Sequence, residues 1–176
     1  MEYRAKKTNY GGRWFKSNLE AKTAEAFDRL GIRWEYESRC FRDYRYSGGQ
    51  YTPDFWLPDV YTYIEVVGRP DQRHVSNAAL FCKTQGIPTE GVWNVRTLSE
   101  DNPDFALIVG DGTAMRVNSY EENGLTRDCG PVICESCGKI HFIDGTGSWS
   151  CPHCGSWSKS NQGMGNNLFE LAGIHA

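Results

Sequence analysis

The stretch YTPDFWLPDVYTYIEVVG, residues 51–68, decides the fold of this chain. Apolar, aromatic and β-branched residues dominate positions 51–57 and 61–67, which predicts two short strands. Pro58 and Asp59 lie between them and predict a turn. Two strands joined by so short a connection predict an antiparallel hairpin.

Two acidic residues of this hairpin, Asp54 and Glu65, are expected to approach each other across the strand pair. Each lies among apolar or aromatic neighbours, and burying a carboxylate is costly unless its charge is compensated. A divalent cation would compensate it, and oxygen ligands suit Mg²⁺, or Mn²⁺ in its place. The alternative is a hairpin that carries two ordinary edge acids.

Helices are predicted before and after the hairpin. Ser17 can cap a first helix that ends at Gly31, and Asp71 can cap a second that runs to about Lys83. Glu20 lies three residues after Ser17, which is the spacing of a capping box. Glu20 is therefore either a capping residue or a third carboxylate beside the other two.

Further strands are predicted at 32–37, 92–95 and 105–109, where apolar residues alternate with charged ones or form short runs. Residues 113–128 are expected to be a linker or edge structure. Helices placed among several strands predict an α/β domain with a mixed sheet flanked by helices.

Four cysteines, Cys134, Cys137, Cys151 and Cys154, form a Cys-x2-Cys…Cys-x2-Cys set. Two such pairs on either side of a short hairpin can hold one Zn²⁺ in a closed tetrahedral site, which predicts a structural zinc ribbon. The ribbon is expected either to contact nucleic acid or to stabilise the preceding domain. The other three cysteines show no pairing pattern and are expected to be free thiols.

The composition fits a folded protein without a membrane span. The chain has 176 residues, of which 39% are hydrophobic and 13% aromatic. No apolar run approaches the ~18 residues that a membrane helix needs. The first residues lack the apolar segment of a signal peptide, so we expect a cytoplasmic protein with reduced thiols.

The charge is unevenly distributed. The net charge is −3, yet residues 1–50 carry eleven Lys or Arg and seven Asp or Glu. Residues 1–16 are polar and basic with interspersed aromatic residues, and they predict a flexible arm. Such an arm could follow a phosphate backbone, or it could simply be solvated.

The helix with Glu20, the segment Trp34-Glu35-Tyr36-Glu37, the motif Tyr-Thr-Pro-Asp-Phe and the strand Ile-Glu-Val-Val-Gly together resemble the PD-(D/E)xK nuclease superfamily. Within it, they are most similar to the phage endonuclease I family of Holliday-junction resolving enzymes. The similarity covers roughly residues 17–85. It implies a restriction-endonuclease-like fold, a phage origin with action in the cytoplasm of a bacterial host, and DNA as the partner.

The resemblance also implies roles for particular residues. Glu20, Asp54 and Glu65 would be the acids that bind Mg²⁺. The family strand reads Glu-x-Lys, but this chain has Val67 at the lysine position. The missing function would then come from Arg69, Lys83 or Gln72, with His74 as a weaker candidate.

The expected organisation is a basic arm (1–16), a nuclease-like core (17–128), a zinc ribbon (129–160) and a tail (161–176). The tail is expected to be flexible, with an apolar end that could dock on the body or on a second subunit. The expected function is metal-dependent hydrolysis of phosphodiester bonds in DNA, including branched DNA, for which two cuts would favour a homodimer. The alternatives are a catalytically weakened DNA- or partner-binding module with a nuclease fold, and an adaptor built around the zinc ribbon.

Overall fold

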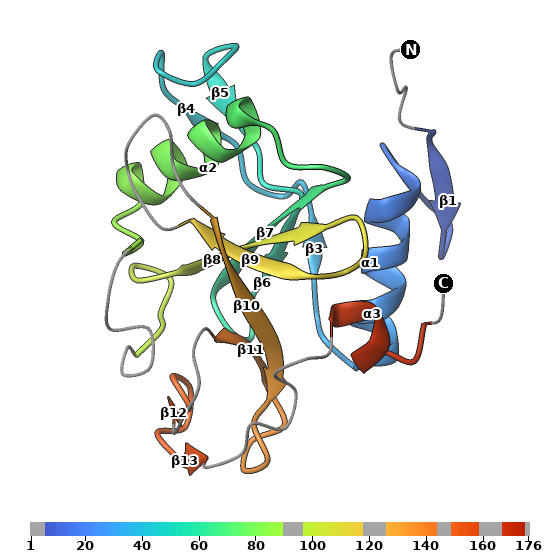
Figure 1. Ribbon diagram of the computed structural model, residues 1–176, viewed down its shortest axis with the longest axis vertical. Helices are drawn as coiled ribbons and strands as arrows, with labels where there is room; N and C mark the ends of the chain where they lie inside the picture. The colour runs from blue at the N-terminus through green and yellow to red at the C-terminus, as the bar shows by residue number, and fades with distance from the viewer. Residues whose placement is uncertain (1–5, 90–96, 118–125, 144–148, 159–166, 175–176) are drawn as a thin grey trace.

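The hairpin at residues 51–68 is present and lies inside a larger sheet. The computed structural model describes residues 6–89, 97–117, 126–143, 149–158 and 167–174 (Figure 1). Strand β6 (Phe55–Leu57) pairs antiparallel with β7 (Thr62–Val67), and Phe55 lies opposite Ile64. The predicted hairpin is therefore confirmed, although its first strand is shorter than expected.

A seven-stranded mixed sheet forms the centre of the molecule, in the order β11-β10-β9-β8-β7-β6-β3. Its other strands are β3 (Glu35–Tyr36), β8 (Asp104–Val109), β9 (Ala114–Val117), β10 (Thr126–Ile133) and β11 (Ile140–Ile143). Strands β7 and β8 are parallel, because helix α2 lies between them in the chain, and the other neighbours are antiparallel. The predicted α/β class is confirmed.

One long helix packs on each face of this sheet. Helix α1 (Asn18–Arg29) is capped by Ser17, and α2 (Gln72–Thr84) is capped by Asp71, as the sequence predicted. Side chains alternate along β7, so Ile64 packs with the cluster beneath α1 and Tyr63 with the cluster beneath α2. The result is a three-layer arrangement in which β7 is covered on both faces (Figure 1).

The N-terminal segment is more ordered than a flexible arm. Strands β1 (Thr8–Tyr10) and β2 (Arg13–Phe15) form a hairpin through a turn in which Gly11 and Gly12 have φ angles of +56° and +81°. Phe15 is only 1% exposed, and its ring packs edge-to-face against Tyr36 with the ring centroids 4.7 Å apart. Burial of Phe15 explains the difference, because it ties the end of the expected arm to the core.

The expected boundary between core and ribbon at residue 128/129 lies inside a strand. Residues 114–117 and 126–128, expected to be linker or edge structure, belong to β9 and β10. The first half of β10 pairs with β9 and the second half with β11. One continuous sheet therefore joins the two predicted domains.

Several smaller elements complete the chain. They are β4 (Phe41–Arg42) with β5 (Gln50–Tyr51), β12 (Trp149–Ser150) with β13 (Trp157–Ser158), and helix α3 (Leu168–Leu171). Tyr51, predicted in the central hairpin, pairs with Phe41 instead. The strand predicted at 92–95 lies outside the described residues.

Helix α3 shows where the apolar end of the tail goes. Leu168 and Phe169 are 0% and 2% exposed and pack in the same cluster as α1. The backbone N–H of Leu168 donates to the carbonyl of Gly112 over 2.8 Å. This segment therefore docks on the body of its own chain, one of the two placements that the sequence left open.

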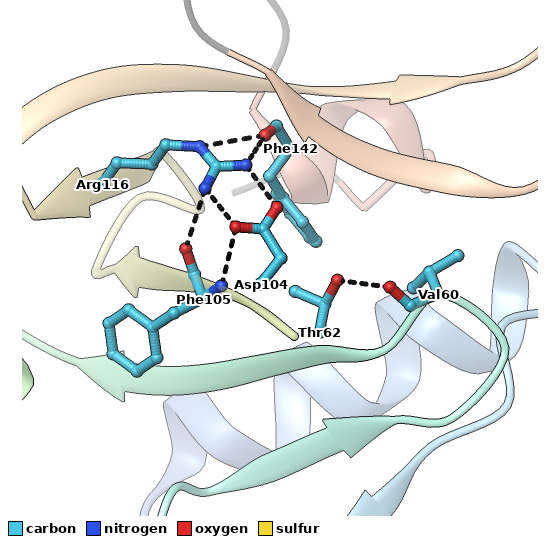
Figure 2. Close-up of polar contacts among 6 residues, drawn as sticks. All are labelled: Val60, Thr62, Asp104, Phe105, Arg116 and Phe142. Carbon is cyan, nitrogen blue, oxygen red and sulfur yellow. Dashed lines mark hydrogen bonds and ion pairs between the residues drawn. The ribbon is translucent and has the colours of Figure 1, made fainter. Parts of the chain in front are cut away.

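A buried ion pair connects the central sheet to the ribbon (Figure 2). The guanidinium of Arg116 on β9 forms a two-pronged contact with the carboxylate of Asp104 on β8, and both residues are less than 10% exposed. Its Nε also donates to the carbonyl of Phe142 on β11 over 3.1 Å. The arginine thus binds strands from both parts of the sheet at once.

Candidate active site and metal centre

Asp54 and Glu65 lie together at the end of the β6–β7 pair. Asp54 is one step beyond the Phe55–Ile64 pair, so it falls opposite Glu65. Its Oδ2 accepts a hydrogen bond of 2.7 Å from the backbone N–H of Val66. The Tyr51 hydroxyl donates to Oε2 of Glu65 over 3.0 Å. Each carboxylate is therefore held by a donor on a different element.

Glu20 approaches the same place from helix α1. Its side chain is 6% exposed and accepts hydrogen bonds from the Ser17 hydroxyl, at 2.7 Å, and from the Tyr36 hydroxyl. Oε2 also accepts from the backbone N–H of Lys16 at 3.2 Å. Because the Ser17 side chain in turn accepts from the Glu20 N–H, Glu20 both supports the helix start and faces the other acids.

Burial and neighbouring carboxylate charges raise the pKa values of Asp54 and Glu65. Burial, followed by the charges of Glu65 and Glu20, holds the pKa of Asp54 well above its usual range. Burial raises the pKa of Glu65 to about 7 against the opposing Tyr51 hydrogen bond, and the Glu20 charge adds to the effect. Several anions in a partly buried site need positive charge nearby, and a divalent cation fits that requirement.

The spacing of the acids limits how one ion could be held. In the described part of the chain, the four cysteines place their ligand atoms within 4.8 Å of one another, close enough to share one ion. The carboxylate oxygens of the three acids form no group of this kind among the described residues. Coordination by all three acids would thus need side-chain movement or bridging waters, which Mg²⁺ commonly retains.

Two charged members of this cluster, Lys16 and Glu37, were not predicted from the sequence. The Lys16 ammonium forms an ion pair with Glu37. Both charges act on Glu65, with Lys16 lowering its pKa and Glu37 raising it. The only sequence signal was their position: Lys16 directly precedes the Ser17 cap, and Glu37 directly follows the strand that carries Tyr36.

For the four residues expected to replace the missing lysine, the structure describes no contact with the three acids. These residues are Arg69, Gln72, His74 and Lys83. The side-chain amide of Gln72 donates to Ser76 over 3.3 Å, and His74 contacts the capping residue Asp71. Arg69 and Lys83 are exposed. Lys83 lies eleven residues after Gln72 on α2, about 16 Å along the helix axis.

Val67, at the position where the Glu-x-Lys motif has lysine, carries no charge. It is 5% exposed and packs in the apolar cluster beneath α2. A charged side chain at this position would have to displace that packing or lose its hydration.

The four cysteines form a compact cluster at the far end of the sheet. The Sγ atoms of Cys134 and Cys154 are 3.7 Å apart, as are those of Cys137 and Cys151. A disulfide would place the sulfurs about 2.05 Å apart. A Zn²⁺ ion with four thiolates at about 2.3 Å gives tetrahedral edges of about 3.8 Å, so the cluster fits a structural zinc.

The two Cys pairs sit in turns with the same hydrogen-bond pattern. The N–H of Gly138 donates to the carbonyl of Cys134 at 2.7 Å, and the N–H of Gly155 to that of Cys151 at 2.8 Å. Both glycines have φ near +70°, a backbone angle that residues with a side chain rarely adopt. This repeated turn explains why a glycine directly follows each Cys-x2-Cys pair.

Polar neighbours support the cysteine cluster. The Ser156 hydroxyl lies 3.0 Å from Cys154 Sγ and 3.4 Å from Cys134 Sγ. Burial opposes the effect, but the hydrogen bonds from Ser156 and the knuckle N–H groups lower the pKa of Cys134 to about 6. The buried His141 ring places Nε2 3.4 Å from Cys151 Sγ. Hydrogen bonds of this kind stabilise the thiolates that a zinc ion requires.

Comparison of the whole chain with known proteins gives no relative. No protein-family model matches it, no curated protein matches it, and no solved structure matches it. Among the described helices, none has the length and apolar character needed to cross a lipid bilayer.

Proposed function

We propose that this protein is a metal-dependent nuclease with a restriction-endonuclease-like core that hydrolyses phosphodiester bonds in DNA. The observation that carries the proposal is the convergence of Glu20 on helix α1, Asp54 directly before β6 and Glu65 on β7 into one cluster of interacting carboxylates. The central hairpin between two helices supports the same fold assignment.

The cluster has the features that this chemistry needs. Glu20, Asp54 and Glu65 would hold Mg²⁺ or Mn²⁺, which when bound polarises the attacking water and neutralises charge on the phosphate. Water oxygen forms a bond to phosphorus, and the bridging P–O bond breaks with its electron pair on the leaving sugar oxygen. The proton released by the water passes to solvent, and solvent protonates the leaving oxygen. The fixed carboxylates orient the reacting groups throughout.

An open cavity beside the cluster supports nucleic acid as the substrate. The cavity, with a volume of about 470 Å³, is lined by residues that include Tyr10, Arg13, Trp34 and Tyr36. Tyr36 links it to the acids, because its hydroxyl donates to Glu20. Aromatic rings and an arginine are suited to stacking with bases and contacting phosphate. The substrate strand would pass through this cavity.

The test is cleavage of a DNA panel by the intact, zinc-loaded protein. The panel contains duplex, nicked and four-way DNA, with RNA of the same sequence as a further arm, in Mg²⁺ and in Mn²⁺. Asp54→Asn should lower the cleavage rate by ~10³-fold or more, while DNA binding persists. Calorimetry should also show loss of Mn²⁺ binding in this variant, a readout independent of activity.

Asp59→Asn is the matched control. Asp59 lies in the turn of the same hairpin, where it pairs with Arg33, and its side chain is 44% exposed. It should cut like the wild type. Cleavage by Asp54→Asn at the wild-type rate, or no cleavage of any substrate by the wild type, would reject the nuclease proposal.

The alternative is a non-catalytic binding module, and the burial of Val67 favours it. No cation can act from that position without disrupting the apolar cluster beneath α2. The module would bind DNA without cutting it, and Asp54→Asn would leave binding unchanged.

Branched DNA and a homodimer belong to the same proposal. Two cuts in a junction need two active sites, which a twofold dimer would supply. Sedimentation of the protein alone and with four-way DNA measures whether one or two copies bind.

A further inference from the structure

Glu37 has an unusual backbone conformation next to the acidic cluster. Its φ angle is +47°, in the left-handed region that residues other than glycine adopt uncommonly. Its N–H donates to the carbonyl of Asp54 over 2.8 Å, so its backbone lies directly beside Asp54. Strained conformations of this kind persist where the surroundings hold them, frequently at functional sites.

The side chain of Glu37 holds Lys16. Their charged groups form an ion pair, and the Glu37 side chain is 26% exposed while that of Lys16 is 65% exposed. The Lys16 ammonium is therefore restrained by Glu37, while most of the lysine side chain remains open to solvent. An ion pair so exposed contributes little to stability, so stability alone does not explain why a strained residue makes it.

The backbone of Lys16 is also fixed at the cluster. Phe15 before it is buried, and Ser17 after it caps helix α1. The Lys16 N–H donates to the Glu20 carboxylate over 3.2 Å. The ammonium is therefore tethered close to the acids, and the charges of Glu37, Asp54 and Glu20 all favour its protonated form.

A polyanionic strand that approaches four carboxylates is repelled unless a cation faces it. The charge of Lys16 acts on Glu65, whereas Arg69 is exposed before the start of α2 and Lys83 is exposed in the last turn of α2. An exposed, tethered ammonium is well suited to contact a non-bridging phosphate oxygen as negative charge develops there.

We propose that Lys16 is a catalytic residue that contacts the phosphate undergoing cleavage, and that Glu37 is a positioning residue that holds Lys16 in place until the phosphate arrives. This inference rests on the proposed nuclease function. Lys16 donates a charge-assisted hydrogen bond from Nζ to the phosphate and transfers no proton. It thereby supplies the positive charge that is absent at Val67.

The test compares single-turnover cleavage by the full-length protein carrying Lys16→Met, Lys16→Arg or Glu37→Gln. Lys16→Met should lower the rate by ~100-fold or more, the scale of losing one preorganised electrostatic contact. Lys16→Arg should recover part of the loss. Glu37→Gln should lower the maximal single-turnover rate by about tenfold, with the half-saturating concentration nearly unchanged, because Glu37 acts on the orientation of Lys16 and not on DNA binding.

Lys22→Met is the matched control, on helix α1. The Nζ atom of Lys22 lies 4.4 Å from the centroid of the Phe169 ring, a ring that a methionine side chain can also contact. The Lys22→Met variant should therefore cleave DNA at the wild-type rate. Thermal unfolding shows that each variant is folded. Lys16→Met at the wild-type rate, with Asp54→Asn inactive, overturns the lysine assignment alone. A wild type that cuts nothing overturns both proposals.

Discussion

At the scale of single residues, the buried acidic cluster destabilises the folded protein. Glu20, Asp54 and Glu65 are each held by specific donors, yet burial and mutual repulsion raise the pKa values of Asp54 and Glu65. Without a bound cation, the folded state must carry these charges close together. A cation or added protons would relieve the repulsion.

The metal-free protein should therefore lose stability as the pH rises. The pKa of Glu65 is about 7 in the folded state against 4.5 for an unperturbed glutamate side chain. Between these values the folded state binds more protons than the unfolded state, so the free energy of unfolding falls with increasing pH. Glu65→Gln should remove this contribution and melt roughly 5 °C above the wild type at pH 8, with a smaller difference at pH 5.

Thermal unfolding at several pH values, without added divalent ions, measures this effect. Glu25→Gln is the control, because Glu25 lies on α1 in an i,i+4 pair with Arg29. It should follow the wild-type pH dependence. Parallel pH profiles for the wild type and Glu65→Gln would contradict the prediction.

At the scale of elements, helix α3 shows how tightly the end of the described chain is fitted. Gly112 lies in the β8–β9 turn with φ of +90°, and a Cβ atom added there would lie 2.6 Å from Cδ2 of Phe169. Phe169 and Leu168 fill the apolar cluster beneath α1. The docking of α3 therefore depends on the absence of a side chain at Gly112.

Gly112→Ala should destabilise the protein by ~1–3 kcal/mol more than Gly48→Ala. Gly48 has a matching φ of +88° with no atom within 4 Å of an added Cβ, so it reports the backbone cost alone. Urea unfolding of both variants gives the difference. Equal losses in the free energy of unfolding for the two variants would mean that α3 does not pack against Gly112 in solution.

At the scale of the whole molecule, the cysteine cluster and the acidic cluster occupy two ends of one sheet. Strand β10 pairs with β9 of the core and β11 of the ribbon, and Cys134 follows directly after it. The Arg116–Asp104 pair and its contact with Phe142 join the same strands in a buried position (Figure 2). Loss of one partner of such a pair leaves a buried charge, so the two parts are expected to unfold together.

Removal of zinc should therefore destabilise the core as well as the ribbon. The helical circular-dichroism signal, to which α1 and α2 contribute, should show a melting temperature at least ~10 °C lower after chelation, because metal-binding energy is folding energy in small metal modules. Cys154→Ser should reproduce the loss, whereas Cys40→Ser, at an exposed cysteine outside the cluster, should not. An unchanged helical transition after zinc loss would show two independent domains.

The sequence by itself determined the features that depend on neighbouring residues. Ser17 and Asp71 mark the helix starts, because a cap satisfies N–H groups only two or three residues away. The central hairpin follows from two apolar runs around a turn, and the cysteine cluster from two short pairs with glycine at the required turn.

Only the tertiary structure decided which distant segments meet. Lys16 and Glu37 are twenty-one residues apart, and they come together because Phe15 is buried and β3 pairs with β6. The sheet runs through the predicted boundary at 128/129 because β10 finds partners on both sides. Such contacts depend on packing and strand pairing across the whole chain, which no local pattern of residues encodes.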